Sequence, residues 1–424
     1  MTMDADEIRR IREVVERWCR VYDVRWDDTG AMFYVILTPT PSRAFADLQS
    51  ELRRSGYVSG LRRMGGEDVI VVGRSVPHPE RAITVNVILL ILTIASTVWA
   101  GSIMWASSYG TSGSFADSFR PENLAMGAVT FALPLMFILG VHEMGHYLMA
   151  RRYGMNASLP YFIPAPPPII FGTFGAFISI RDPMPNRRAL FDIGIAGPLS
   201  GFVAAIPVVM IGLYLTTGDV DDVGRSGDYI LLHLPLLYVL LQHLVPPSGT
   251  LLHPTAFAGW VGLLVTAMNL LPAGQLDGGH IARAFLRDRA KYAAYGSIAV
   301  LLLLGLAFPG WIVFAFLIFF LGLRHPPPLD DVTTLDGKRK AMGAVVVLVM
   351  VLSFVPIPWR RCTTRPQSTR WSSGRTSPSA WSRRAGRGRS TCPSSTPATG
   401  TTPSMSMRPG TSAGTSRQGP PRSP

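Results

Sequence analysis

The sequence alternates between long apolar runs and shorter charged segments. Uncharged, strongly apolar runs cover residues 82–114, 123–141, 193–218, 229–276, 292–323 and 341–358. A helix needs about 20 apolar residues to cross a hydrocarbon layer, so runs of this length predict membrane-spanning helices. The run 292–323 is too long for one span, and Pro309-Gly310 predicts that it folds as a helical hairpin. The pattern therefore predicts a mainly α fold, a polytopic membrane helical bundle over residues 82–358.

Residues 1–81 follow a different pattern, in which charged residues occur throughout. Apolar residues recur at helical spacing over residues 4–20, and a strand-like segment follows at 32–38. A second helix is predicted at 42–55 and another strand at 69–72. We therefore expect a small soluble α/β domain with a regulatory or packing role. We expect no cleavable signal peptide, since the first long apolar run comes only after this domain.

Lysine and arginine in connecting segments favour the cytoplasmic side, so their distribution predicts the orientation of the chain. Basic residues precede the first run, follow the second run at Arg151 and Arg152, and follow the fourth run at 283–291. The segment 219–228 after the third run is acidic and poor in Lys and Arg. We therefore predict a multi-pass protein of the cell membrane whose N-terminal domain is cytoplasmic.

The composition changes sharply near residue 359. Residues 360–422 contain 12 Arg and no Lys, Asp or Glu, so they supply nearly all of the formal net charge of +13, and that charge does not indicate nucleic-acid binding. After Cys362 there is no Leu, Ile, Val, Phe or Tyr, and we expect residues 359–424 to be a disordered basic tail. Two interpretations stay open: a natural tail that binds anionic lipid, or a frameshift product, which the Arg, Ser, Pro and Gly content favours.

The motif H-E-M-G-H at residues 142–146 follows an uncharged run. Ionisable residues in a membrane segment are rare and usually functional. His142 and His146 are four residues apart, so on a helix both imidazoles lie on one face and can bind one metal ion. Glu143 is adjacent to the first histidine, where it can take a proton from water as a general base.

A catalytic zinc site normally has three protein ligands and an open position for water. The candidate for the third ligand is Asp277, in the segment N-L-L-P-A-G-Q-L-D-G-G-H at 269–280, which ends an apolar run. His142 and His146 lie near the cytoplasmic end of their span, so Asp277 must also lie at a cytoplasmic end. This requirement predicts that residues 229–245 do not cross the membrane fully and are interfacial or re-entrant.

Together, the two motifs resemble the site-2 protease family of intramembrane zinc metalloproteases. The segments GTFGAFISI and FDIGIAGPLSG are similar to the branch of this family in archaea, cyanobacteria and plastids, which has no PDZ domain. The resemblance covers residues 82–358. It implies a three-helix catalytic core and a zinc-dependent endopeptidase that hydrolyses peptide bonds in transmembrane segments, as in regulated intramembrane proteolysis.

The resemblance also implies roles for individual residues. One Zn²⁺ per chain is bound by His142, His146 and Asp277, Glu143 is the general base, and Asn269 assists substrate or transition-state contacts. The partners expected are a single-span membrane-protein substrate and the lipid bilayer, with no nucleic acid, and the oligomeric state stays open. A catalytically inactive scaffold that binds membrane helices would lack Glu143 or a ligand. A zinc transporter would carry polar residues at several depths, whereas here they concentrate at one level.

Several glycines have an expected structural role. Gly172 and Gly175 precede a strand-like segment at 176–180, and this hairpin either offers an edge to an extended substrate or simply closes the bundle. The proline-rich segment 160–168 before it is expected to be a stiff connector. Between helices, close packing is expected at Gly194, Gly197 and Gly201.

Overall fold

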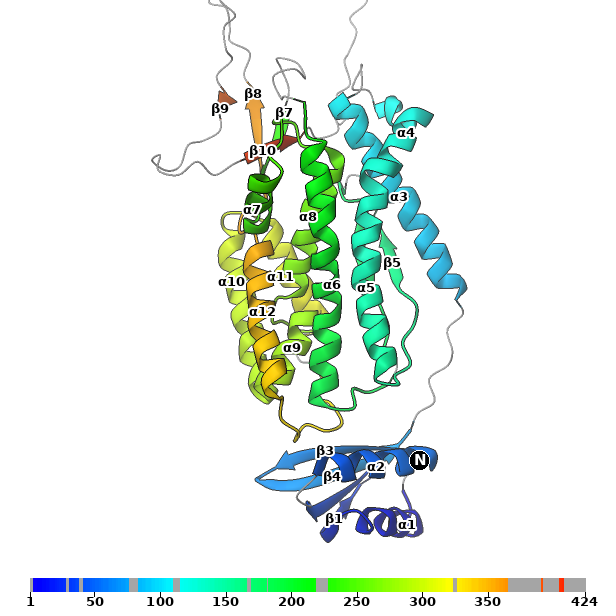
Figure 1. The fold of residues 1–424 in the computed structure, drawn as a ribbon. Helices are drawn as coiled ribbons and strands as arrows, with labels where there is room; N and C mark the ends of the chain where they lie inside the picture. Colours follow the sequence, from blue (N-terminus) through cyan, green and yellow to red (C-terminus); the bar gives the residue numbers. More distant parts are fainter. Residues whose placement is uncertain are drawn as a thin grey trace, which may run out of the picture.

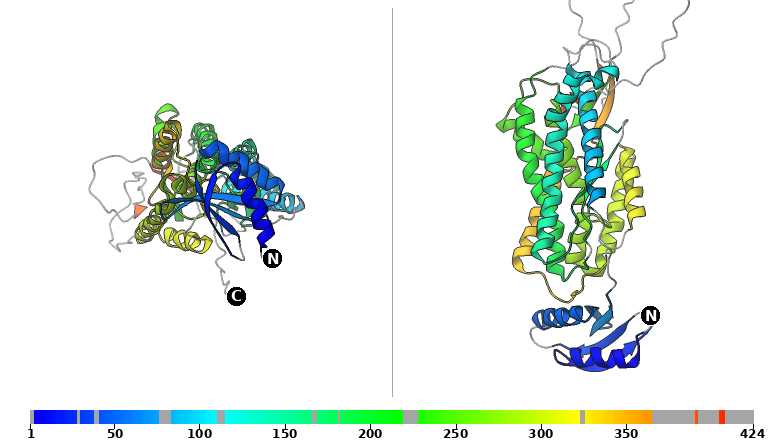
Figure 2. Two further views of the ribbon diagram at one scale, coloured as in Figure 1. Left: turned by 90° about the horizontal axis from the view of Figure 1, so that it is seen from below. Right: turned by 90° about the vertical axis from the view of Figure 1, so that its right-hand side faces the viewer.

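The computed structural model describes residues 3–27, 30–37, 41–75, 83–109, 115–165, 169–180, 182–218, 228–322, 326–364, 390–391 and 404–407. These residues form a long helical bundle with a small α/β unit at one end, as two perpendicular side views show (Figures 1 and 2). The predicted fold class is confirmed: a mainly α, polytopic helical bundle with a short β-hairpin and a small N-terminal α/β unit.

The N-terminal unit consists of a four-stranded antiparallel sheet and two helices. Its strands are β1 (Arg20–Trp26), β2 (Ala31–Ile36), β3 (Tyr57–Met64) and β4 (Glu67–Arg74), in the spatial order β1-β2-β4-β3. Helices α1 (Ala5–Glu16) and α2 (Pro41–Arg54) share a core with the sheet, in which Phe33, Ile70 and Val72 are fully buried. Within β4, Ile70 and Val72 are two positions apart and point to the same face of the sheet, because side chains alternate between the two faces.

The sequence pattern predicted the two central strands, β2 and β4, and missed β1 and β3. Both missed strands lie at the edges of the sheet. Their sequences, RVYDVRW and YVSGLRRM, carry charged residues. Charge is common on edge strands because it discourages pairing with another chain. It also hides the alternation by which a half-buried strand is recognised.

The bundle contains ten named α-helices among the described residues. They are α3 (Thr84–Tyr109), α4 (Pro121–Gly127), α5 (Leu133–Arg152), α6 (Arg187–Tyr214), α7 (Leu236–Leu244), α8 (Pro254–Asn269), α9 (Asp277–Leu286), α10 (Ala290–Gly305), α11 (Gly310–Leu321) and α12 (Gly337–Ser353). A π-helical turn, η2 (Ala128–Ala132), joins α4 to α5, and the short 3-10 helices are η1 (Phe115–Phe119) and η4 (Arg287–Arg289). Within the described part of the chain, three helices are long and apolar enough to cross a membrane: Thr84–Tyr109, Pro121–Arg152 and Arg187–Tyr214.

Two predictions about the later runs agree with this arrangement. The run 229–276 is not one helix, since it begins with strand β7 (Asp228–His233) and the nine-residue α7 before α8 starts. A nine-residue helix is only about 14 Å long, so α7 is too short to cross a membrane. Helices α10 and α11 pack against each other as a hairpin that turns at Pro309.

Strand β5 (Tyr161–Pro164) pairs antiparallel with strand β6 (Thr173–Phe177). The prediction that 160–168 is only a connector was therefore wrong for its first part, and residues 166–168 lie outside the described residues. The prolines misled the prediction because proline cannot donate a ladder hydrogen bond. An edge strand tolerates proline where its N–H would face away from the partner.

Within the tail, the structure describes strands β8 (Trp359–Thr364), β9 (Ser390–Thr391) and β10 (Ser404–Met407), which join β7 in the order β10-β7-β8-β9. At the start of β8, the ring of Trp359 packs edge-on against Phe308 and Trp260. The rest of the tail lies outside the described residues. The expectations about its disorder and its origin therefore stay predictions.

Helices α5, α6 and α8 pack together as the predicted three-helix core. Close contact between them depends on small residues: a Cβ atom at Gly212 of α6 would lie 2.3 Å from the backbone of Ala256 in α8. Pro134 of α5 has no N–H to bond the carbonyl of Thr130 one turn earlier. The hydroxyl of Thr255 in α8 donates to that carbonyl instead, at 2.7 Å. The proline thus frees a carbonyl that ties α5 to α8.

Candidate metal centre

Helix α5 carries His142, Glu143 and His146 into the interior of the bundle. Their relative exposures are only 3%, 5% and 6%. The two imidazoles are one helical turn apart and face the same side, with ring centroids 5.0 Å apart. Buried ionisable groups are costly unless they are paired or bind a metal, so this part of α5 needs a partner from elsewhere in the chain.

Asp277 supplies that partner as the first residue of α9. A short turn after α8 reverses the chain, and Gly274 in it adopts a φ of +53°. A Cβ atom at Gly278 would lie 2.2 Å from the carbonyl oxygen of Leu270, so only glycine allows α9 to start this close to the end of α8. The glycines that surround Asp277 in the sequence therefore serve a close backbone approach that brings its carboxylate back to α5.

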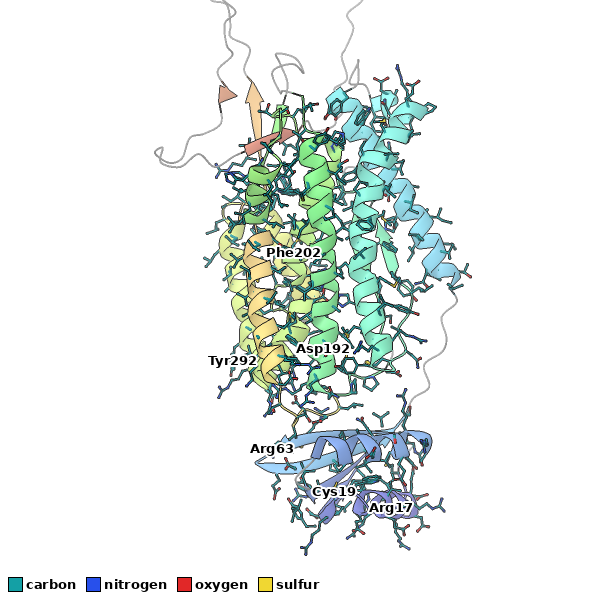
Figure 3. All side chains as sticks on the ribbon, viewed as in Figure 1. Arg17, Cys19, Arg63, Asp192, Phe202 and Tyr292 are labelled. Atoms are coloured by element: carbon teal, nitrogen blue, oxygen red, sulfur yellow. The ribbon has the colours of Figure 1, made fainter. Side chains whose placement is uncertain are left out.

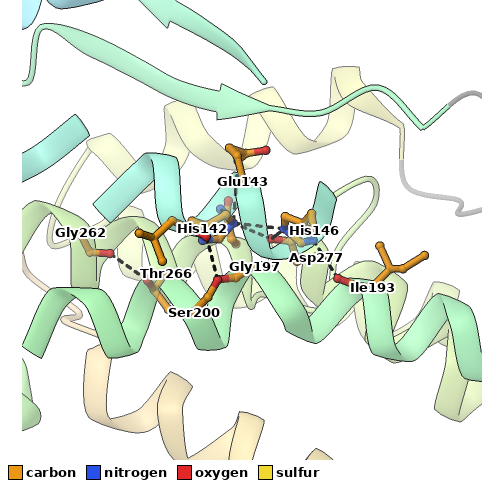
Figure 4. Close-up of polar contacts among 11 residues, drawn as sticks. His142, Glu143, His146, Ile193, Gly197, Ser200, Gly262, Thr266 and Asp277 are labelled. Carbon is orange, nitrogen blue, oxygen red and sulfur yellow. Dashed lines mark hydrogen bonds and ion pairs between the residues drawn. The ribbon is translucent and has the colours of Figure 1, made fainter. Parts of the chain in front are cut away.

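The three side chains meet at one point (Figure 4). The Nε2 atoms of His142 and His146 are 3.3 Å apart, and Asp277 Oδ2 lies 3.3 Å from the first and 3.2 Å from the second. In tetrahedral coordination with bonds of about 2.0–2.1 Å, two donor atoms are separated by about 3.3 Å. The donor set and its spacing therefore fit a zinc ion. It is also the one such group of His, Cys, Asp and Glu within the described part of the chain.

The orientation of His146 is fixed by a backbone contact on α6. Its Nδ1 lies 2.8 Å from the carbonyl oxygen of Ile193. Because a carbonyl only accepts, Nδ1 must carry the proton, and Nε2 keeps a lone pair directed at the cluster. This contact could not be predicted from the sequence, since a backbone carbonyl has no residue-specific signature.

Small residues on α6 make room for both imidazoles. A Cβ atom at Gly197 would lie 2.0 Å from His146 Nε2, and one at Gly201 would lie 3.0 Å from His142 Nδ1. On α5, a Cβ atom at Gly145 would meet Ser200 Oγ at 2.4 Å. The expectation of close packing at Gly194, Gly197 and Gly201 is confirmed, and the structure adds that two of the three face the histidines.

Glu143 stands apart from the three clustered donors. Its Oε1 lies 4.0 Å from His142 Nε2, too far for a hydrogen bond and close enough to share a small substrate group. Its side chain points away from α6, and the backbone of Ile178, just after β6, interacts with its carboxylate. Glu143 therefore faces the space between the cluster and the β5–β6 hairpin.

Asn269, the last residue of α8, also reaches the cluster. Its Nδ2 lies 3.4 Å from His142 Nε2. An amide at this position has donors to offer to a carbonyl oxygen held beside the cluster. The structure thus brings Asn269 together with the predicted ligands.

The two glycines of the hairpin lie in different surroundings. Gly172 has a φ of +65°, accepts a hydrogen bond from Ser96 Oγ at 2.6 Å, and a Cβ atom there would be 2.6 Å from the Ser96 carbonyl oxygen. Its contacts are therefore with α3. Gly175, with a φ of +105°, has open space where a Cβ atom would stand. Gly175 pairs with Ile163 of β5, and β6 has no second neighbour in the described sheet.

The sequence analysis did not identify Arg187, whose guanidinium binds the C-terminal turn of α9. Arg187 is 5% exposed, and its Nε donates to the carbonyl oxygen of Ala284 at 2.9 Å. The last carbonyls of a helix have no partner within the helix, and a cation there is favourable. In the sequence, Arg187 and Arg188 only mark the charged start of an apolar run. The contact of Arg187 with the end of α9 therefore could not be predicted from the sequence.

Residues 130–308 match Peptidase family M50. Two similar proteins of Arabidopsis thaliana are "Probable zinc metalloprotease EGY2, chloroplastic" and "Probable zinc metalloprotease EGY1, chloroplastic". Each is 33% identical to this chain, over 57% and 54% of this chain respectively and 44% of the relative. "Probable zinc metalloprotease EGY3, chloroplastic" of Oryza sativa subsp. indica is 28% identical over 62% of this chain and 50% of the relative.

The chain spans half or less of the length of these curated relatives. No solved structure matches it.

Proposed function

Residues 130–308 form a Peptidase family M50 domain, and from this premise we propose that the chain is an intramembrane zinc metalloprotease that hydrolyses peptide bonds within transmembrane segments of membrane proteins. The family match confirms the resemblance that HEMGH and NLLPAGQLDGG carried in the sequence. The relatives are named as probable zinc metalloproteases, and we propose the same metal, zinc, and the same reaction, proteolysis, for this chain. The observation that carries the proposal is the set of three donor atoms at 3.2–3.3 Å from one another, buried among apolar helices.

His142, His146 and Asp277 would hold the metal ion in this proposal. When bound, zinc supplies Lewis-acid chemistry, since it polarises a carbonyl group and lowers the pKa of water to about 7. The chain itself supplies the orientation, because Ile193 fixes one imidazole and Gly278 lets the carboxylate approach. A preformed donor set of this kind loses little freedom on binding the ion.

Glu143 is the residue that would move protons. Its carboxylate takes a proton from the attacking water at Oε1 and passes it to the nitrogen of the leaving amine. Its position beside the donors, and not among them, suits this role. Asn269 Nδ2 would donate a hydrogen bond to the carbonyl oxygen of the scissile peptide as negative charge develops there.

The β5–β6 hairpin would hold the substrate. The backbone bonds of a helix are satisfied internally, so a transmembrane helix must unwind before a peptide carbonyl can reach the metal. An unwound segment can pair with the free edge of a strand. The edge of β6 suits this because Glu143 interacts with the backbone at Ile178, just beyond that strand. Gly175, with open space at its Cβ, belongs to this proposed substrate edge, whereas Gly172 is explained by its contact with α3.

We further propose that residues 82–358 form the membrane-embedded protease of a multi-pass cell-membrane protein, with residues 1–81 as a cytoplasmic domain. The charge distribution between the apolar runs supports this orientation. The proposed substrates are single-span membrane proteins, because one free helix must reach the cluster from the bilayer.

The substitution Glu143→Gln tests the proposed reaction. Purified chain in phospholipid nanodiscs is incubated with a single-span model substrate, and zinc content is measured in parallel. We expect E143Q to keep one zinc per chain and to lose cleavage by about 10²–10⁴-fold, the usual contribution of a general base. His146→Ala should lose both zinc and cleavage. Full zinc occupancy in H146A would contradict the assignment of His146 as a ligand. Undiminished cleavage by E143Q would contradict the assignment of Glu143 as the general base.

A further inference from the structure

A cavity of about 500 Å³ lies between α9, the start of α10 and the segment that follows α11. Its lining includes Arg283, Arg287, Asp288, Lys291, Pro326 and Pro327. His142, His146 and Asp277 do not line it. The cavity is therefore a second candidate site, which shares none of the three candidate ligands.

The charged side chains that line the cavity are mostly cationic. Arg283, Arg287 and Lys291 face one carboxylate, Asp288, whose side chain is 92% exposed and therefore surrounded by water. Arg287 donates to the carbonyl oxygen of Val332 at 3.2 Å, and the Lys291 ammonium lies 5.1 Å from the ring of Tyr292. Among the described residues, neither Arg287 nor Lys291 forms an ion pair. Arg283 pairs with Asp288 at 3.4 Å and with Asp331 at 2.8 Å, so the positive charge without an ion pair in the lining is that of Arg287 and Lys291.

Arg283 is built into the wall of this cavity. The residue is 4% exposed, and its Nη2 lies 2.8 Å from Asp331 Oδ2. Asp331 does not line the cavity, so its carboxylate holds the guanidinium from outside. The other nitrogen, Nη1, is buried and has no hydrogen-bond partner among the described residues. A buried N–H of a guanidinium is costly when unpaired, so Arg283 still lacks one hydrogen-bond acceptor.

Arg287 stands out by its backbone conformation. Its φ of +53° is the one positive value for a non-glycine residue in the described part of the chain. Such conformations persist only where the surroundings impose them, and they cluster at ligand-binding positions. Here the strained residue directly follows α9 and contributes a cation to the cavity.

The surroundings of the cavity are those of a membrane interface. Tyr292 of α10 lies near the end of the bundle that faces the N-terminal unit, at a level similar to Asp192 (Figure 3). Tyr292 and Tyr295 are 64% and 46% exposed, and further along α10 the exposed large apolar residues are Val300, Leu302 and Leu303. Exposed tyrosines followed by exposed aliphatic residues mark the transition from headgroups to hydrocarbon. Basic pockets between helices at this depth bind anionic headgroups.

We propose that this cavity binds a phosphate group, presented either by the headgroup of an anionic phospholipid or by a soluble phosphate compound. Arg283 supplies a fixed, buried cation in the wall, and Arg287 and Lys291 supply partly exposed cations in the lining. Arginine suits the role because its planar fork matches the oxygens of a phosphate.

A bound phosphate would also contact the turn that positions Asp277. Gly274 and Gly279 line the cavity, and Asp277 is the first residue of the same helix as Arg283. The segment that contains Asp331, the ion-pair partner of Arg283, also contacts strand β3 of the N-terminal unit. The backbone N–H of Asp331 donates to the carbonyl oxygen of Leu61 at 3.2 Å, and the backbone N–H of Leu61 donates to the carbonyl oxygen of Leu329 at 2.6 Å. Occupancy of the cavity therefore stabilises the junction between α9 and the N-terminal unit.

The test measures binding to the full-length chain and needs no assay of cleavage. Native mass spectrometry compares retention of phosphatidylglycerol with that of phosphatidylcholine. In parallel, calorimetry in phosphatidylcholine nanodiscs measures binding of inorganic phosphate and of ATP. The variant R287Q/K291Q removes two partly exposed cations, and R289Q/K338Q removes the same charge from exposed residues that do not line the cavity.

We expect R287Q/K291Q to lower the affinity for the species that binds by roughly tenfold or more, because two charge-assisted contacts are lost. R289Q/K338Q should change that affinity by less than about twofold. D288N should strengthen binding, since it removes the one carboxylate in the lining. Preference for phosphatidylglycerol that R287Q/K291Q abolishes identifies a lipid headgroup, and binding of phosphate or ATP with the same dependence identifies a soluble source. Equal retention of both lipids without binding of phosphate or ATP, or equal loss in the two double variants, overturns the proposal.

Discussion

The imidazole of His146 occupies space that any side chain at position 197 would need. Gly197 lies on α6 directly opposite this histidine, where an added Cβ atom would be 2.0 Å from Nε2. Gly140, two residues before the motif on α5, has no such neighbour within 4 Å. The two positions are both helical glycines, and they differ in whether a methyl group disturbs a predicted ligand.

The substitution Gly197→Ala should therefore displace His146 and weaken zinc binding, by roughly the 10–100-fold typical of changes that misorient a metal ligand. Gly140→Ala serves as the matched control and should keep zinc, because its methyl group meets open space. Competition with a chelator, followed by metal analysis, measures both affinities. Equal zinc affinity in the two variants would contradict this prediction, and would mean that the backbone of α6 shifts enough to accommodate the methyl group without displacing His146.

Glu7 is a second residue whose surroundings give a measurable property. Arg74 donates to its carboxylate at 2.6 Å and Tyr57 at 2.7 Å, and these hydrogen bonds lower the pKa of Glu7 from 4.5 to about 2. A lowered pKa means that the folded unit favours the charged form. The contribution to stability is therefore present above about pH 4.5 and is lost as the pH falls towards 2.

We expect the N-terminal unit to loosen over this acidic range in the full-length chain. Hydrogen exchange of residues 3–75, corrected for the intrinsic effect of pH, should show decreasing protection between pH 4.5 and pH 2. Glu7→Gln should lower protection at neutral pH and reduce the pH dependence in this window. An unchanged pH profile in E7Q would assign the acid sensitivity to other carboxylates.

Helices α5 and α8 are held together at the point where α5 departs from regular geometry. The π-helical turn η2 precedes Pro134, which leaves the Thr130 carbonyl for the hydroxyl of Thr255 on α8. The hydroxyl of Thr266, on the same helix, donates to the carbonyl of Gly262 within its own helix. The first hydroxyl therefore joins two elements, whereas the second supports only one.

Thr255→Val should destabilise the bundle by about 1–3 kcal/mol, because it leaves a buried carbonyl without a partner. Thr266→Val should cost less, since that carbonyl can already accept from the helix backbone. Unfolding by a denaturing detergent from mixed micelles gives both values. In a Pro134→Ala background the backbone N–H returns, and the cost of T255V should shrink, so that strictly additive effects would refute the link.

Which elements could be predicted depended on how local their signals were. HEMGH specifies a helical face by itself, and its pairing with the segment around Asp277 pointed to residues that the structure brings within 3.3 Å. The edge strands β1 and β3 and the proline-bounded β5 have weak patterns, because each pairs on one side only. Arg283 and Arg287 served in the sequence only as orientation signals. Their cavity depends on the return of the chain after α11, which no local pattern encodes.

The cluster of His142, His146 and Asp277 lies towards one end of the helical bundle. Helix α5 ends at Arg152, six residues after His146, which is about 9 Å along a helix axis. That end of the bundle faces the N-terminal unit (Figure 1). In the proposed orientation this unit is cytoplasmic, so the cluster lies in the cytoplasmic half of the membrane and a short polar path suffices to bring water to it.

The position of the cluster predicts where a substrate is cut. A single-span substrate should be cleaved in the cytoplasmic half of its transmembrane segment, and mass spectrometry of the products locates the cut. Because the segment must unwind, Gly or Asn near the cut should speed cleavage, each weakening the helix by roughly 0.5–1 kcal/mol. A matched substrate carries the same residues in the opposite half and should be cleaved as slowly as a helix of Leu and Ala alone. Cutting in the opposite half, or equal rates for the two substrates, would contradict the proposed orientation or the need for unwinding.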